Sequence, residues 1–218
     1  MAEVIFQGPT GRLEGRYTHQ KTAGAPIALI LHPHPQGGGS MNNTIAYNLF
    51  QAFERRGFSV LRFNFRGVGR SQGIYDGGIG ELSDAAAALD WMQSFNPSAK
   101  QCWVAGYSFG AWIAMQLLMR RPEIAGFISV SPPANLYDFS FLAPCPASGI
   151  IVHGRSDRVV PEADVDRLAE RLKTQKGIVV EYQKLEGANH FYEATLADLM
   201  GLVEGYLDKR LPRVVESG

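Results

Sequence analysis

Short apolar runs rich in β-branched residues alternate with longer amphipathic runs along most of this chain of 218 residues. That alternation is typical of a mostly parallel sheet with helices packed on both faces. The expected strands cover residues 27–31, 60–65, 102–105, 127–130, 150–153 and 178–185. The expected helices cover residues 44–56, 81–95, 111–120, 161–173 and 195–210. We therefore expect a three-layer α/β fold.

The beginning of the chain does not follow this alternation. Residues 4–6 and 12–17 flank the sequence Gly-Pro-Thr-Gly at residues 8–11. This pattern predicts an antiparallel hairpin at one edge of the sheet. No repeat, low-complexity tract or linker divides the sequence that follows. Because a domain has about 100–200 residues, we expect a single domain over residues 1–218.

The composition excludes several classes of protein. The 21 Lys and Arg residues equal the 21 Asp and Glu residues in number, and 45% of all residues are hydrophobic. Disorder requires low hydrophobicity with high net charge, and nucleic-acid binding usually requires a basic excess, so neither is expected. Two cysteines are too few for a disulfide framework, and no apolar run is long enough for a membrane span. We expect a cytoplasmic protein with a small-molecule partner and without a nucleic-acid or membrane partner. The exposed edge hairpin is compatible with a homodimer.

One pentapeptide predicts the chemistry. Residues 106–110 read Gly-Tyr-Ser-Phe-Gly, a Gly-x-Ser-x-Gly pattern between an expected strand and an expected helix. A turn this tight holds its central serine in a strained backbone conformation, and only small residues two positions away avoid clashes. Ser108 would then project at the carboxyl end of the sheet, beside a helix N-terminus and its partial positive charge. The pattern indicates a nucleophilic serine.

A nucleophilic serine needs a base to take its proton and a carboxylate to orient that base. In folds with this turn, the acid and then the histidine follow the serine along the chain. Of the five histidines, only His190 lies beyond a suitable acid, in a loop after the last expected strand. The acid candidate is Asp157, directly after the expected strand 150–153. All three residues fall at the carboxyl ends of strands, so we expect a catalytic triad of Ser108, Asp157 and His190.

These motifs resemble those of the α/β-hydrolases over nearly the whole chain. The similarity includes the turn around Ser108, the His-Gly-x-x-Asp-x-Val-Val-Pro segment at residues 153–161, and Asn-His-Phe at residues 189–191. Leu-His-Pro-His-Pro at residues 31–35 and the opening segment resemble a branch of small, lidless bacterial hydrolases related to dienelactone hydrolase. Dienelactone hydrolases use a cysteine nucleophile where this chain has Ser108. The resemblance implies cleavage of an ester, thioester or amide, and it does not specify one substrate.

An oxyanion hole can be predicted from backbone chemistry. The first donor is expected to be the N–H of Phe109, which follows the nucleophile. The second donor is expected in the loop after the first parallel strand, where Pro33 and Pro35 have no N–H. The backbone N–H of His34 lies between these prolines and is the expected second donor, with Gln36 as the next candidate.

Two further motifs suggest bound groups, and neither is complete. His32 and His34 resemble a metal-binding pair, but no cysteine or carboxylate cluster accompanies them, so we expect no metal. The Gly-Val-Gly sequence at residues 67–69 resembles the start of a dinucleotide fingerprint, but the next glycine falls one position late. We therefore expect no cofactor. His153 ends an expected buried strand, where a structural hydrogen bond is expected.

The length of one loop predicts how a substrate reaches Ser108. Only 19 residues, 131–149, separate two expected strands at the point where many α/β-hydrolases insert a cap. Because this is too short for a cap of several helices, we expect an open cleft lined by Met41, Tyr107 and Phe191. An open cleft favours a serine hydrolase of carboxylic esters with short or medium acyl groups. The alternatives are a peptidase or amidase with the same triad, and a non-catalytic binding module.

Overall fold

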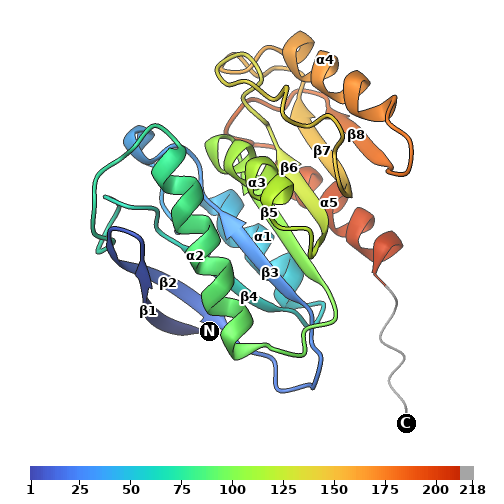
Figure 1. Cartoon of the computed structure of the whole chain (residues 1–218). Helices are drawn as coiled ribbons and strands as arrows, with labels where there is room; N and C mark the ends of the chain where they lie inside the picture. Colours follow the sequence, from blue (N-terminus) through green and yellow to red (C-terminus); the bar gives the residue numbers. More distant parts are fainter. Residues whose placement is uncertain (212–218) are drawn as a thin grey trace.

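Eight strands of the computed structural model, which describes residues 1–211, form one continuous sheet (Figure 1). They lie in the order β1-β2-β4-β3-β5-β6-β7-β8. The strands are β1 (Ala2–Gly8), β2 (Gly11–Thr18), β3 (Ile27–Leu31), β4 (Ser59–Phe63), β5 (Cys102–Tyr107), β6 (Ile124–Val130), β7 (Ser148–Gly154) and β8 (Val180–Leu185). The helices are α1 (Thr44–Glu54), α2 (Ile79–Phe95), α3 (Phe109–Arg120), α4 (Glu162–Lys173) and α5 (Leu196–Arg210), with a 3₁₀ helix at Pro35–Gly37. The single domain expected over residues 1–218 includes residues 212–218, which lie outside the described residues.

The N-terminal hairpin forms as the sequence predicts. β1 pairs antiparallel with β2, and Gly8 lies opposite Gly11 at the turn. β2 also pairs antiparallel with β4. All other neighbouring strands pair in parallel. The predicted mostly parallel sheet with an antiparallel N-terminal hairpin is therefore confirmed.

Helices cover both faces of the sheet (Figure 1). α1 and α5 pack on one face, whereas α2, α3 and α4 pack on the other. The side chains of β3 alternate between these two layers, with Leu29 on the α2 face and Ile30 on the α1 face. Both faces are buried, which explains why all five residues of β3 are apolar. The expected three-layer fold is confirmed.

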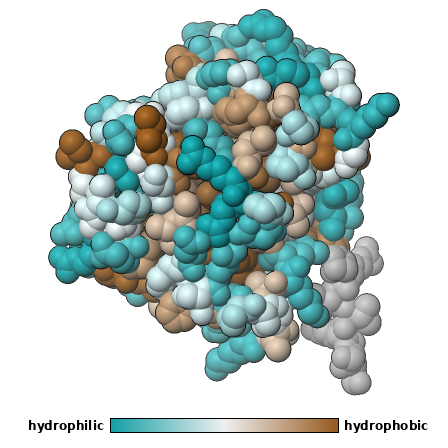
Figure 2. Space-filling model, in the orientation of Figure 1, coloured by the Kyte–Doolittle hydropathy of each residue, from teal (hydrophilic) through white to brown (hydrophobic). Residues whose placement is uncertain are grey.

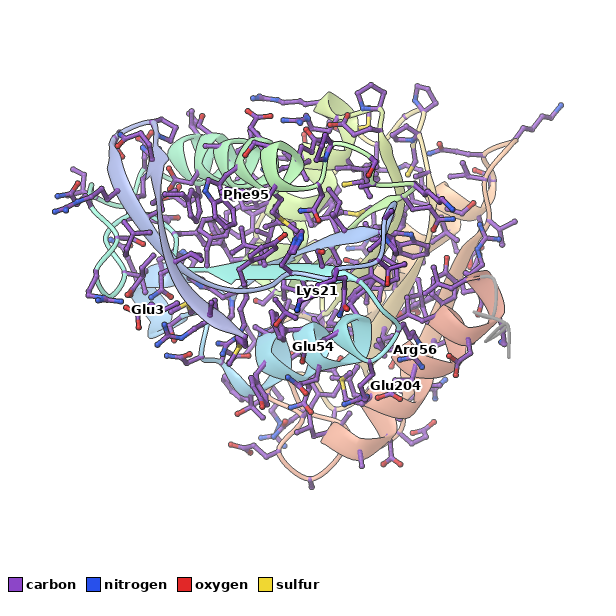
Figure 3. All side chains as sticks on the ribbon, turned by 90° about the horizontal axis from the view of Figure 1, so that it is seen from below. Glu3, Lys21, Glu54, Arg56, Phe95 and Glu204 are labelled. Atoms are coloured by element: carbon purple, nitrogen blue, oxygen red, sulfur yellow. The ribbon has the colours of Figure 1, made fainter. Side chains whose placement is uncertain are left out.

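Polar contacts join α1 and α5, the two helices that pack on the same face of the sheet. Arg56 follows α1 and lies beside Glu204 of α5 (Figure 3). Its guanidinium donates a hydrogen bond of 3.2 Å to the backbone carbonyl of Glu204, and its Nη2 lies 3.6 Å from the carboxylate Oε2. These contacts hold the end of α1 against α5.

Figure 2 shows a mostly hydrophilic face on which apolar residues occur singly or in small groups. Among residues 1–211, no helix combines the length and the apolar character that crossing a membrane requires.

The loops after β3, β5, β7 and β8 lie along one edge of the sheet, because these strands run in the same direction. Ligands of open α/β sheets bind at this carboxyl edge. The segment between β6 and β7, residues 131–147, contains no helix. The expected absence of a sizeable cap domain at this position therefore agrees with the structure.

A buried ion pair fixes the loop after β4 at the same edge. Arg66 follows β4, and the side chain of Asp84 on α2 is fully buried. The Nε and Nη2 atoms of Arg66 donate to the Asp84 carboxylate at 2.9 and 2.7 Å, and the Arg66 backbone N–H donates at 3.0 Å. The hydrogen bond with Asp84 raises the pKa of Arg66, so the guanidinium stays charged.

We expect Asp84→Asn to lower the free energy of unfolding by about 3–5 kcal/mol, because it leaves a buried guanidinium without a counter-charge. Urea unfolding at pH 7 measures this change. Asp76→Asn is the matched control, since Asp76 is exposed and lies 3.9 Å from the same arginine. A change below about 1 kcal/mol is expected for the control. Equal losses in the two variants would contradict this account of the pair.

Candidate active site

A single residue joins β5 to α3. β5 ends at Tyr107, α3 begins at Phe109, and Ser108 lies between them with φ of 53° and ψ of −120°. Positive φ is uncommon for a serine and costs about 1–3 kcal/mol. The Ser108 N–H donates to the carbonyl of Val130 at 2.8 Å, and the Ser108 carbonyl accepts from Ala111 of α3 at 2.8 Å. The serine is therefore held in a strained turn by its own backbone hydrogen bonds.

Two glycines make this turn possible. A Cβ on Gly106 would lie 2.2 Å from the carbonyl oxygen of Gly110. A Cβ on Gly110 would lie 2.2 Å from the carbonyl oxygen of Leu31 on β3. Both contacts are with backbone atoms that cannot move aside. The two glycines of the Gly-x-Ser-x-Gly pattern are thus required because α3 packs so closely on β3 and β5.

Ser108, His190 and Asp157 form one continuous chain of hydrogen bonds. His190 Nε2 lies 3.1 Å from Ser108 Oγ, and His190 Nδ1 lies 2.7 Å from Asp157 Oδ2. The other carboxylate oxygen of Asp157 accepts the backbone N–H groups of Val159 and Val160, both at 2.8 Å. The structure therefore brings together the three residues that the sequence predicts as a triad.

The environment keeps Asp157 ionised. Burial raises the pKa of this carboxyl, but the hydrogen bond from His190 and the N–H of Val160 outweigh burial and lower the pKa below its ordinary value. An ionised carboxylate beside Nδ1 accepts a hydrogen bond from that nitrogen. Nε2 of His190 is then the nitrogen that can accept a proton from Ser108.

Tyr107 does not line the cleft as the sequence predicts, because its side chain is buried. Only 2% of this residue is exposed, and its hydroxyl donates to the backbone carbonyl of His190 at 2.7 Å. Its ring packs 5.5 Å from the His190 ring, measured between centroids. Because the side chain has so little free surface, it supports the His190 loop and does not offer a substrate contact.

Met41 also lies outside the expected cleft lining. It is 3% exposed, its N–H donates to Asn64 Oδ1 at 2.7 Å, and its carbonyl accepts from Arg62. Burial under the loop after β3 leaves its side chain too little surface to line a cleft. Phe191, the third expected residue, is 60% exposed and packs edge-on against His190 at 5.5 Å. Phe191 alone of the three presents a large free surface.

The two predicted oxyanion donors are the backbone N–H of His34, in the loop after β3, and that of Phe109, the first residue of α3. Among residues 1–211, neither the N–H of His34 nor that of Phe109 donates to a backbone carbonyl. The alternative donor, the N–H of Gln36, donates to His34 Nδ1 at 3.2 Å and is therefore engaged. The rings of His34 and Phe109 are in contact, with centroids 5.0 Å apart. These observations favour His34 over Gln36 as the second donor.

Tyr75 was not predicted from the sequence and contacts this loop. Its hydroxyl lies 3.2 Å from His34 Nε2. Burial lowers the pKa of His34, and Nδ1 accepts the N–H of Gln36, so the proton of the neutral ring is on Nε2 and is donated to Tyr75. A tyrosine in a glycine-rich loop after a strand carries no sequence signal that would single it out.

The other histidines of the edge have structural contacts. His32 is fully buried, and it donates from Nδ1 to the carbonyl of Pro33 at 2.7 Å and accepts the N–H of Phe65 at Nε2 at 3.1 Å. His153 donates from Nε2 to the carbonyl of Val160 at 3.0 Å. In the part of the chain that the structure describes, no group of three or more potential metal ligands comes together. His32 and His34 therefore do not form part of a larger ligand cluster.

A surface pocket adjoins His190. It lies between the loops after β7 and β8 and is lined by Ser156, Arg158, Val159, Asn189, His190 and Phe191. His190 and Phe191 are predicted from the sequence as site residues, whereas the other four are not. Only their positions in the sequence could have indicated them, because they flank Asp157 and His190 in the same two loops.

The chain is similar to several known proteins. Residues 28–148, a segment that includes Ser108, match the family model of the serine aminopeptidases S33. A protein of Rickettsia prowazekii (strain Madrid E) is 50% identical over 211 residues, covering 95% of this chain and 89% of that protein.

Two solved structures are similar over almost their whole length. A protein of unknown function from Agrobacterium tumefaciens, assigned to the α/β hydrolases, shares 65% identity with a TM-score of 0.95, covering 96% of each chain. A serine hydrolase without a lid from Xanthomonas campestris shares 29% identity with a TM-score of 0.88, covering 98% of this chain and 96% of its own.

We expect Gly106→Ala to lower the free energy of unfolding by at least about 1–3 kcal/mol, because its new methyl group meets the backbone of α3. Urea unfolding followed by circular dichroism measures the loss. Gly205→Ala on α5 is the control, since a Cβ there meets nothing within 4 Å. The control is expected to gain up to about 1 kcal/mol from helix propensity. A Gly106→Ala protein as stable as the unsubstituted chain would contradict the close approach of α3.

We expect His32 to make stability fall with acid. Burial lowers its pKa from 6.5 to about 4, so the unfolded chain binds this proton at a higher pH than the folded chain does. Stability from this group is complete above pH 6.5, declines as the pH falls toward 4, and the total loss is about 3 kcal/mol. Urea unfolding at pH 7 and pH 4.5 is compared for the unsubstituted chain, His32→Asn and the exposed control His19→Asn. His32→Asn is expected to show a weaker pH dependence than the other two proteins. Equal dependence in all three would refute the assignment.

Proposed function

Because the chain belongs to the α/β serine hydrolases, we propose that it hydrolyses a carboxylic ester with a short or medium acyl group. Ser108 is the proposed nucleophile, His190 the base and Asp157 the residue that orients it. The observation that carries this proposal is the pair of hydrogen bonds, 3.1 and 2.7 Å, that connect Ser108 Oγ through His190 to Asp157. Binding alone would not require this arrangement, which argues against a non-catalytic module.

In the first half of the reaction, Ser108 Oγ attacks the carbonyl carbon of the ester while His190 Nε2 takes the hydroxyl proton. Asp157 stabilises the imidazolium that forms. The tetrahedral intermediate then collapses, the bond to the alcohol oxygen breaks, and His190 gives its proton to that oxygen. The products of this half are the free alcohol and an acyl group bound to Ser108.

In the second half, water replaces the alcohol. His190 takes a proton from water, the resulting hydroxide attacks the acyl carbon, and the proton returns to Ser108 Oγ as the carboxylic acid leaves. The backbone N–H groups of Phe109 and His34 are the proposed donors to the oxyanion in both halves. Each such donor is worth about 3–4 kcal/mol of transition-state stabilisation, or roughly 10²–10³ in rate.

The preference for short or medium acyl groups rests on access. Residues 131–147 form no helix, so this segment supplies no helical cap that could enclose a long acyl chain. The similarity to a serine hydrolase without a lid supports the same proposal.

A peptide or amide substrate is the second candidate. It is favoured by the matching family model, which is named for serine aminopeptidases. Parallel assays with p-nitrophenyl esters and aminoacyl p-nitroanilides distinguish the two candidates. Faster cleavage of the anilides would replace the ester proposal with the amide proposal.

We also propose a cytoplasmic location and a small-molecule substrate. Both cysteines, Cys102 and Cys145, are free and buried, which is compatible with a reducing compartment. The open edge strand β1 is compatible with a homodimer, which size-exclusion chromatography with light scattering would detect.

We expect Ser108→Ala to lose at least about 10⁴-fold in kcat/KM for p-nitrophenyl acetate or butyrate, because no nucleophile remains. Labelling by a fluorophosphonate probe is expected to disappear with it. Ser83→Ala on α2 is the control, since the Ser83 hydroxyl forms an exposed hydrogen bond to the carbonyl of Ile79 on its own helix. Full activity and labelling in Ser108→Ala would overturn the proposed nucleophile.

A further inference from the structure

The pocket beside His190 has a defined place in the reaction. The two proposed oxyanion donors follow β3 and β5, whereas the pocket is lined by residues of the loops after β7 and β8. Figure 1 shows that β7 and β8 lie on the far side of β6 from β3 and β5. In the sheet, β3 lies on one side of β5 and β7 lies on the other, beyond β6, so the pocket and the proposed donor His34 lie on opposite sides of Ser108.

The direction of proton transfer decides which part of the substrate enters this pocket. His190 must give its proton to the alcohol oxygen, so that oxygen lies next to His190 Nε2 when the ester bond breaks. The carbonyl oxygen points the other way, toward the oxyanion donors. The alcohol part of the ester therefore extends toward the loop of His190 and the pocket beyond it.

The pocket has an apolar side formed by two exposed side chains. Val159 is 43% exposed and Phe191 is 60% exposed. Large apolar side chains with this much free surface can cover a ring or a short chain of a bound molecule. Ser156 and Asn189 are the neutral polar residues of the lining.

Arg158 carries the charge of the pocket. It is exposed, and among residues 1–211 it has no carboxylate within ion-pair distance. Its neighbour Arg155 instead lies 3.0 Å from Glu186 and 3.9 Å from Glu162. Asp157, next to Arg158 in sequence, is occupied by His190 and by backbone N–H groups. The guanidinium of Arg158 is therefore available to an anion on a bound molecule.

We propose that the natural substrate is an ester whose alcohol part carries a carboxylate, which binds Arg158 while its apolar portion packs on Phe191 and Val159. This inference rests on the proposed function and specifies its leaving group. A single guanidinium matches a carboxylate, which it can bind through two parallel hydrogen bonds. The products are the carboxylic acid from the acyl group and a hydroxy acid from the alcohol part. Water supplies the hydroxyl of the carboxylic acid and the hydrogen of the released alcohol.

The test compares two matched acetate esters. One has 4-hydroxybenzoate as its leaving group, and the other has the neutral 4-hydroxybenzamide. The specificity ratio, kcat/KM for the first divided by that for the second, is measured for the unsubstituted chain, Arg158→Gln, Arg158→Glu and the control Arg155→Gln. Comparing ratios between proteins removes the intrinsic difference in reactivity between the two esters.

We expect Arg158→Gln to lower the specificity ratio about fivefold, as for the loss of an exposed ion pair, and Arg158→Glu to lower it further. For Arg155→Gln, the specificity ratio is expected to stay within twofold of that of the unsubstituted chain. The kcat/KM for the neutral ester is expected to stay within the same range. Added salt should reduce the ratio in the unsubstituted chain more than in Arg158→Gln.

The failures of the two proposals are distinguishable. A ratio that is the same in the unsubstituted chain, Arg158→Gln and Arg158→Glu, with both esters hydrolysed, would overturn the carboxylate site and leave the ester hydrolase intact. Failure to hydrolyse either ester, or Ser108-independent hydrolysis of both, would overturn the proposed function and this inference with it.

Discussion

The close approach of α3 to the sheet determines where Ser108, the proposed nucleophile, lies. Gly106 and Gly110 allow backbone to pack directly on backbone, so no side chain separates the first turn of α3 from β3 and β5. At that distance only one residue fits between β5 and α3, and Ser108 therefore takes a positive φ. The local strain is balanced by the burial of both elements in the core.

The rest of the candidate site depends on loops that buried contacts hold at the same edge. His32 joins the loop after β3 to the chain after β4 through the N–H of Phe65. Arg66 joins the chain after β4 to α2. The carboxylate of Asp157 accepts backbone N–H groups from its own turn. These buried contacts hold the loops that carry the proposed catalytic side chains.

The sequence predicts most of this arrangement because its main signals are local. Hydrophobic periodicity predicts the sheet and its covering helices, and glycine spacing predicts the turn at Ser108. The boundaries were less accurate at that turn, since β5 extends beyond residue 105 to Tyr107 and α3 begins at Phe109 instead of residue 111. Glycines usually interrupt regular structure, but Gly106 and Gly110 belong to it here because packing requires them.

Packing also explains the residues that the sequence could not assign. Met41 and Tyr107 are apolar or amphipathic residues next to the predicted site, and nothing in their sequence context shows which way they face. The availability of Arg158 depends on where Arg155, Glu162 and Glu186 lie in the folded chain. Such pairing between neighbouring loops is decided by tertiary structure.

The hydrogen bond from Tyr107 to the carbonyl of His190 has a mechanical consequence. Ser108 follows Tyr107 in the chain and is joined to it by a peptide bond. The backbone carbonyl of His190 accepts a hydrogen bond from the hydroxyl of the same tyrosine. We therefore expect a small displacement of β5 against its neighbouring strands to move Ser108 and His190 in the same direction. The gap between Ser108 Oγ and His190 Nε2 should vary less than the distance from either atom to β3 as the sheet fluctuates.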